Sequence, residues 1–127
     1  MRSLHLLLIS FLCIGTALHA ETVRERLKRD PDFQLYAVIF AIVQNDDATV
    51  KSVTIANIFD AASDSKETAS VQLPKAYFEK AEALIRSHKY ALQAKEGKPI
   101  TFFAYYLYSP ELGDRVIDDP DAPVMQK

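Results

Sequence analysis

The chain has 127 residues, of which 49% are hydrophobic and 25% charged, and its formal net charge is −2 at pH 7. This length suits one domain with one core, and mild acidity without a basic stripe argues against nucleic acid as a partner. One cysteine and three histidines leave little material for a thiolate or imidazole site, so we expect neither a metal nor another cofactor.

Residues 1–20 are predicted to be a signal peptide. Arg2 gives a positive start, the run from Leu4 to Leu18 is almost wholly apolar, and small Ala20 precedes charged Glu21. This order is typical of secretory signals, whereas a membrane-spanning helix usually needs a longer apolar run. We therefore expect export to the periplasm and a mature chain with no stable membrane anchor after cleavage. An uncleaved anchor helix is the alternative.

Residues 21–32 form a charged N-terminal arm. Val23 and Leu27, four residues apart, are its apolar pair before Pro31. The residue that precedes a proline is disfavoured in a helix, so a helix here would end at the proline. The arm is predicted to be either a short, marginal helix or a mobile, solvated segment.

Two strands joined by a polar turn follow the arm. The sequence LYAVIFAIV, residues 35–43, is apolar on both faces and rich in β-branched and aromatic residues, so it is predicted to be a central strand that is covered on each side. Residues 44–48 form the turn. Residues 49–59 then alternate with one partly wetted face, which is typical of a hairpin partner at the edge of a sheet.

A helix is predicted after the polar loop of residues 60–70. Pro74 stands where the first turn of a helix accepts a proline. Residues 75–90 then carry a stripe at helical spacing, which consists of Tyr77, Ala81, Leu84, Ile85 and His88. We expect this stripe to pack on one face of the sheet.

The third predicted strand is TFFAYYLY, residues 101–108. The short hairpin makes the first two strands antiparallel, and the helix returns the chain so that the third strand pairs antiparallel with the first. We therefore predict an α+β fold of β-β-α-β order, with a three-stranded antiparallel sheet in the order 2-1-3 and one helix on one face. The third strand is an edge strand, and no lysine or proline between Ile100 and Ser109 protects it.

Aromatic side chains occupy both faces of this third strand. One face carries Phe103, Tyr105 and Leu107, and the other carries Phe102, Ala104, Tyr106 and Tyr108. One helix cannot cover both faces of the sheet. We expect one set to lie in the core, while the other is covered by the N-terminal arm or is available to a partner, a role that suits the amphipathic tyrosine ring.

Residues 111–127 are predicted to be an acidic, disordered tail. From Gly113 onward the chain contains four aspartates and two prolines with little apolar spacing, a composition that is typical of solvated termini. The DDPD sequence within it does not preorganise oxygen ligands as a calcium loop does. We therefore expect no metal site here.

The order of elements, the hairpin of residues 35–59, the approach YALQAKEGKPI and the aromatic last strand resemble the C-terminal domain of the TonB energy transducers. The resemblance covers residues 33–110. In that family the domain binds a short, extended segment of an outer-membrane transporter by strand addition at the edge of its last strand. For this chain the resemblance implies a partner-binding edge made of Thr101, Phe102, Phe103, Ala104, Tyr105, Tyr106, Leu107 and Tyr108. The family's membrane helix and proline-rich spacer are missing, which implies a stand-alone periplasmic member.

No motif in the sequence supplies the convergent polar groups of an active site, so we expect a binding module and not an enzyme. The strongest catalytic alternative pairs His88, the one histidine after residue 20, with Glu82 or a tyrosine of the last strand. The predicted partner is a protein or peptide, such as a transporter segment, or a second copy in a homodimer. The alternative is a small, secreted inhibitor-like or structural domain with no strand partner, in which residues 21–32 close the edge.

Overall fold

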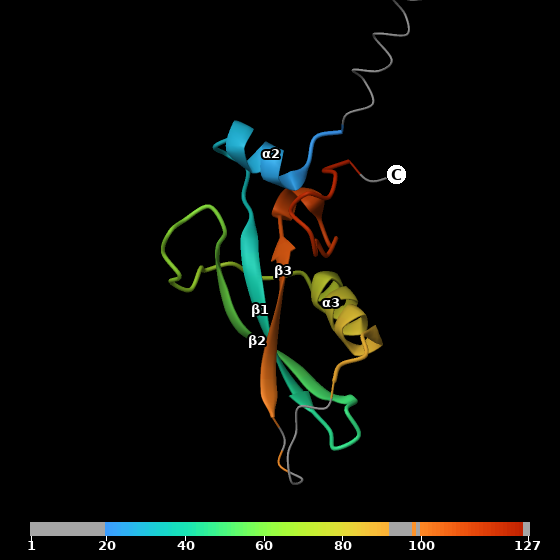
Figure 1. Cartoon of the computed structure of the whole chain (residues 1–127). Coiled ribbons are helices and arrows are strands. Elements are labelled where there is room, and N and C mark those ends of the chain that lie inside the picture. The colour runs from blue at the N-terminus through green and yellow to red at the C-terminus, as the bar shows by residue number, and fades with distance from the viewer. Residues whose placement is uncertain (1–19, 92–97, 99, 126–127) are drawn as a thin grey trace, which may run out of the picture.

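The computed structural model describes residues 20–91, 98 and 100–125. Nearly all of the predicted signal peptide and residues 92–97 of the approach to the last strand lie outside these residues. In chain order the elements are helix α2 (Val23–Arg29), strands β1 (Tyr36–Gln44) and β2 (Val50–Asp60), helix α3 (Lys75–Ser87), strand β3 (Thr101–Tyr108) and the short 3-10 helix η1 (Pro110–Leu112), as Figure 1 shows.

The three strands form one antiparallel sheet in the order β2-β1-β3. The predicted α+β class and the predicted strand order are therefore confirmed. In the β1–β3 ladder, Tyr36 lies opposite Tyr108 and Val43 lies opposite Thr101. Because β3 is last in the strand order, it lies at an edge of the sheet.

The turn between β1 and β2 contains a residue in the left-handed region. Ala48 has φ of 72°, a conformation that costs free energy for residues other than glycine. The turn is held by a hydrogen bond from the Asn45 N–H to the Thr49 carbonyl oxygen over 2.7 Å. The Thr49 N–H also donates to the Asp47 carboxylate over 3.1 Å, so local hydrogen bonds stabilise the turn despite this conformation.

Helix α3 covers one face of the sheet, as predicted. Its buried residues Tyr77, Ala81 and Ile85 pack in the main core with β1 side chains of the same face, namely Val38, Phe40 and Ile42. The rings of Tyr77 and Tyr108 meet edge to face with their centroids 4.9 Å apart. This core therefore fixes the face of β3 that carries Tyr108.

Helix α3 is shorter than predicted and ends at Ser87. His88 adopts an extended conformation with ψ of 144° and is exposed, so its place in the apolar stripe was wrong. The His88 N–H still donates to the Ile85 carbonyl oxygen over 3.3 Å, and its ring lies 6.0 Å from that of Tyr90. Local capping ends the helix before the side chain can reach the core.

A second core joins the two ends of the described chain. It consists of Val23, Phe33, Leu35, Ile117 and Val124. The prediction of a disordered tail is wrong for residues 111–125, because Ile117 is only 1% exposed and Val124 only 9%. In Figure 1 helix α2 and the C-terminal segment lie together at the end of the sheet opposite the β1–β2 turn.

Hydrogen bonds explain why the tail folds against helix α2. The first N–H groups of a helix have no partner within the helix. Here the Val23 and Arg24 N–H groups donate to the carbonyl oxygens of Ala122 and Pro120, over 2.9 and 2.8 Å. The Thr22 and Glu25 side chains complete a capping box at the same end. We call α2 together with residues 117–124 the terminal clasp.

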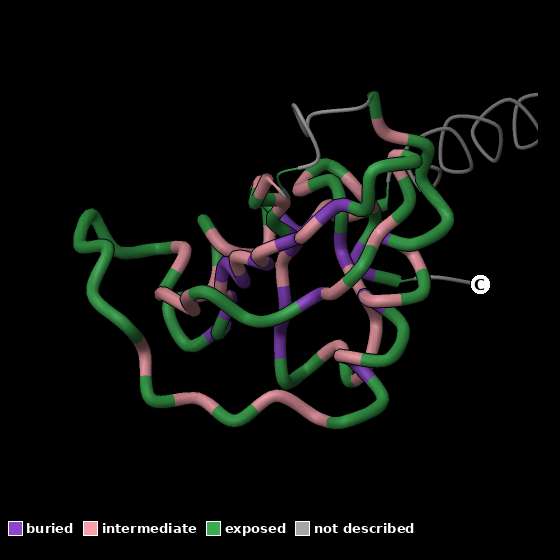
Figure 2. The backbone as a smooth tube through the Cα atoms, turned by 90° about the horizontal axis from the view of Figure 1, so that it is seen from below, coloured by how far each residue is buried: buried purple, intermediate pink, exposed green. Residues whose placement is uncertain are grey.

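The middle of the loop between β2 and α3 lies outside both cores, whereas Ala61 packs against the second core and Val71 and Leu73 pack against the main core. Most of residues 61–70 are exposed, and in Figure 2 this loop projects away from the purple, buried backbone at the centre of the molecule. The Ala69 N–H donates to the Ile58 carbonyl oxygen over 2.7 Å. The loop therefore runs back along the outer edge of β2, so this edge is partly occupied at that point.

Candidate partner-binding edge

The backbone of β3 presents alternate residues to β1 and to the outside. The Gln44 N–H donates to the Ile100 carbonyl oxygen over 3.3 Å, which makes these two residues a hydrogen-bonded pair of the ladder. Because such pairs alternate along antiparallel strands, the even-numbered residues of β3 bond to β1. The backbone groups of Thr101, Phe103, Tyr105 and Leu107 point away from the sheet.

The outward groups of Leu107 are already occupied. Its N–H donates to the Ile117 carbonyl oxygen over 2.7 Å, and its carbonyl oxygen accepts from the Ile117 N–H over 3.2 Å. The Tyr77 hydroxyl donates to the same Leu107 oxygen over 2.9 Å. The terminal clasp thus closes one end of the edge. In the described part of the chain, no strand covers Thr101, Phe103 or Tyr105.

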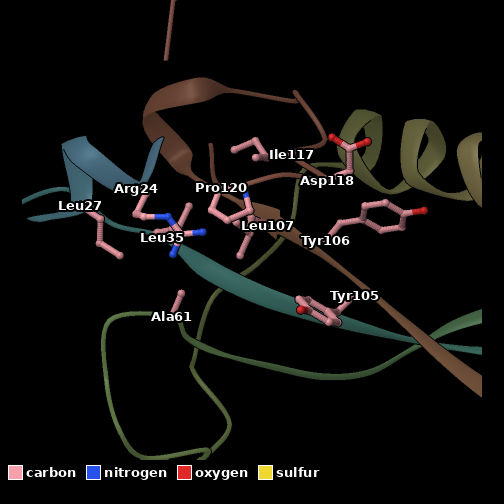
Figure 3. Close-up of a pocket in the computed structure, with 10 residues that line it drawn as sticks. All are labelled: Arg24, Leu27, Leu35, Ala61, Tyr105, Tyr106, Leu107, Ile117, Asp118 and Pro120. Carbon is pink, nitrogen blue, oxygen red and sulfur yellow. The ribbon is translucent and has the colours of Figure 1, made fainter. Parts of the chain in front are cut away.

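The open part of the edge carries two large exposed rings. Phe103 is 64% exposed and Tyr105 is 68% exposed. Both lie on the face opposite α3, whereas Tyr106 is buried on the α3 face. Figure 3 shows Tyr105 and Tyr106 on opposite sides of β3. The strand therefore offers unpaired backbone and apolar side chains at the same place.

A pocket of about 230 Å³ lies where β3 meets the terminal clasp (Figure 3). Its walls come from α2, β3, the tail and the residues that flank β1 and β2. They are lined by Arg24, Leu27, Leu35, Ala61, Tyr105, Tyr106, Leu107, Ile117, Asp118 and Pro120. Four of these ten lie outside β3 and the tail, so tertiary packing, rather than a local motif, creates the pocket.

A second hollow, of about 350 Å³, lies on the other side of Tyr105 and Leu107. It opens on the sheet face that α3 leaves uncovered and is lined by Ala37, Ile39, Phe59, Ala61, Lys66, Tyr105 and Leu107. The Lys66 ammonium lies 4.5 Å from the centre of the Phe59 ring, which positions the loop as one wall. Tyr105 thus stands between two hollows.

Charged groups surround the pocket at the terminal clasp. The Arg24 guanidinium donates to the Asp121 carboxylate over 2.8 Å, and this hydrogen bond, together with the charge of Asp121, raises the pKa of Arg24. The Tyr77 hydroxyl, which donates to the Leu107 carbonyl oxygen, has its pKa raised by burial. Asp118 is exposed at the mouth of the pocket.

The structure divides the predicted edge residues into two groups. The side chains of Phe102, Ala104, Tyr106 and Tyr108 belong to the main core, whereas Thr101, Phe103 and Tyr105 are exposed and Leu107 is partly covered by the second core. Sequence reasoning missed Ile117, and it named Leu27 only as part of the apolar pair of the N-terminal arm. The sequence signal for a buried residue in the tail was Ile117 itself, an apolar residue among aspartates, but no periodic pattern marked it as part of a core.

No family model, curated protein or solved structure matches this chain. Within the described residues, no helix combines the length and the apolar character that crossing a membrane requires. In the same part of the chain, no three His, Cys, Asp or Glu side chains gather in a way that would hold a metal ion.

Proposed function

We propose that this chain is a protein-binding module that recognises an extended segment by strand addition at β3. One observation carries the proposal: the outward backbone groups of Thr101, Phe103 and Tyr105 lie next to two exposed aromatic rings at an unprotected sheet edge. Proteins usually protect such edges with charges, prolines or bulges. An added strand gains backbone hydrogen bonds at this edge, and pockets beside it select its side chains.

The pairing of Ile117 with Leu107 supports the proposal. This contact is an antiparallel bridge with two hydrogen bonds, 2.7 and 3.2 Å long, so a segment from outside the sheet already adds to the same edge. This bridge leaves the outward backbone groups of Thr101, Phe103 and Tyr105 without a strand partner among the described residues. An added strand would run over Thr101 to Tyr105 and place a side chain in the 230 Å³ pocket at the clasp.

The cellular setting belongs to the same proposal. Export by the segment 1–20 would place the module in the periplasm, and the resemblance to TonB C-terminal domains would make a transporter segment a natural partner. This role needs no catalytic group, because recognition uses the backbone of β3 and the rings of Phe103 and Tyr105. Strand addition itself does not depend on the TonB resemblance.

Substitution of Phe103 by proline tests the module directly. The Phe103 N–H points away from β1, so proline removes an outward donor without removing a hydrogen bond of the β1–β3 ladder. Peptides are first selected from a phage-displayed random library on the immobilised protein. We expect Phe103→Pro to weaken their binding about tenfold or more, which corresponds to ~1.4 kcal/mol.

Two controls make this test specific. Phe103→Ala removes the ring but keeps the N–H and should bind more tightly than Phe103→Pro, while circular dichroism verifies that both variants are folded. In the wild-type complex, amide exchange should slow at Phe103 and Tyr105. Equal binding by the proline variant, or complete protection of these amides in the free monomer, would refute strand addition at β3.

A further inference from the structure

We infer that the segment that adds to this edge is β3 of a second copy, paired antiparallel about a two-fold axis at Phe103. The inference rests on the proposed function and names the occupant of the edge. In this arrangement Phe103 lies opposite its own equivalent, and Thr101 of each copy lies opposite Tyr105 of the other. Each outward N–H and carbonyl group of these residues finds its partner, because outward-facing residues pair with outward-facing residues.

The two neighbouring registers are excluded by residues at the ends of the strand. Shifting the second copy one way would pair Thr101 with Leu107, whose backbone groups are already bonded to Ile117. Shifting it the other way would pair Tyr105 with residue 99, which is a proline and has no N–H to donate. The two-fold axis at Phe103 is therefore the register that uses the whole open edge.

The side chains fit this register on both faces of the continuous sheet. On the face opposite α3, the two Phe103 rings are neighbours and each Tyr105 ring lies beside a Thr101, both of which are favourable kinds of cross-strand pair. On the α3 face, Phe102 of each copy lies opposite Ala104 of the other. Large residues therefore meet small ones, and the rings that are 64% and 68% exposed in the monomer are covered.

Charges at the ends of the strand complement this arrangement. Lys98 precedes β3 and is exposed, and Asp118 and Asp119 are exposed beside Ile117 at the opposite end of the edge. In the antiparallel pair the lysine end of one copy runs toward the aspartate end of the other. A second copy of this chain therefore brings a positive group to each acidic end, and like charges do not meet.

The short edge also sets the expected strength of the pairing. The open stretch runs only from Thr101 to Tyr105, which is smaller than a standard interface of roughly 800 Å² per partner. We therefore expect a reversible dimer that forms at concentrations between about 1 μM and 1 mM. Sedimentation over this range should show the weight-average mass rising from that of a monomer toward that of a dimer.

Disulfide trapping measures the register. In a Cys13→Ser background the chain has no thiol of its own, and a hydrogen-bonded antiparallel pair places its Cα atoms ~5.5 Å apart, within reach of a disulfide. We expect Phe103→Cys to form a covalent dimer under mild oxidation. An equimolar mixture of Thr101→Cys and Tyr105→Cys should form mixed dimers, whereas Thr101→Cys mixed with Phe103→Cys should not form them.

Amide exchange at about 1 μM and about 1 mM completes the test, because it separates this inference from the proposed function. Protection of Phe103 and Tyr105 that rises with concentration, together with the expected disulfides, supports the dimer. Mixed disulfides between positions 101 and 103 would overturn the register. A monomer with unprotected amides at both concentrations would overturn the dimer but leave peptide addition standing. Full protection in the dilute monomer would overturn both.

Discussion

Ser109 shows how one polar group constrains the end of β3. Its side chain is fully buried, and its hydroxyl oxygen has no hydrogen-bond partner among the described residues. A buried polar group without a partner loses its hydration and gains no bond in return. This position directly follows β3 and precedes η1, so the penalty falls at the end of the strand.

Ser109→Ala should therefore stabilise the protein or leave its stability unchanged. Removing a buried, unsatisfied hydroxyl gains about 1–3 kcal/mol, offset in part by the small cavity that remains. Urea unfolding followed by circular dichroism measures the difference. A clear loss of stability would show that the hydroxyl makes a hydrogen bond in solution, for example to a buried water.

Ala48 allows a second prediction at the scale of single residues. Its φ of 72° is a conformation that glycine adopts without steric cost. Ala48→Gly should raise the free energy of unfolding by roughly 0.5–1 kcal/mol, because relief of strain at this φ exceeds the extra entropy of an unfolded glycine. The control is Ala83→Gly at an exposed position in the interior of α3, which should lower stability by a similar amount.

At the scale of elements, helix α2 depends on groups that its own sequence only partly supplies. Seven residues are too few for a stable isolated helix. The capping box was present in the sequence, but the hydrogen bonds to Ala122 and Pro120 come from the tail. This is why the sequence left the choice between a helix and a mobile arm open, whereas the longer, periodic α3 and the β-branched β1 could be predicted.

Two carboxylates that flank α2, those of Glu21 and Asp30, give a prediction about pH. The hydrogen bond from Arg29 lowers the pKa of Glu21. The pKa of Asp30 is lowered most by the hydrogen bond from the Asp32 N–H and, to a smaller extent, by Arg26. Carboxylates with lowered pKa values stabilise the folded state above their unfolded pKa values, 4.5 and 3.8, and this contribution is lost as the pH falls through the folded values.

We therefore expect the terminal clasp to loosen below about pH 4, before the main core does. Two-dimensional NMR spectra recorded from pH 6 to pH 3 should show shifts at Val23 and Val124 that precede those at Ile85. In Glu21→Gln this early change should be smaller. Simultaneous changes at all three residues would show that these carboxylates do not control the clasp.

At the scale of the whole molecule, two cores meet along β3. The main core lies under α3, and the second core joins residues that are far apart in the sequence. Local patterns predicted the first core and the edge strand, because alternation and helical spacing are visible within short windows. They could not predict the clasp, since nothing near Ile117 indicates that Leu107 is its partner.

Ile117→Ala tests the second core. Ile117 is 1% exposed, so the substitution should lower the free energy of unfolding by about 2–5 kcal/mol. Met125→Ala, at a side chain that is 81% exposed, is the matched control and should change it by less than about 0.5 kcal/mol. Equal effects of the two substitutions in urea unfolding would place Ile117 outside the core in solution.

The bridge between Thr22 and Pro123 also has a kinetic consequence. Closing a loop of about a hundred residues carries an entropic cost that hairpin contacts avoid, so the sheet and α3 should assemble first and the clasp last. The same contacts should be the first to open in the native protein. Each such opening frees the Leu107 N–H and carbonyl oxygen from Ile117. While the clasp is open, an added strand can therefore pair with one more outward residue of β3 than in the closed state.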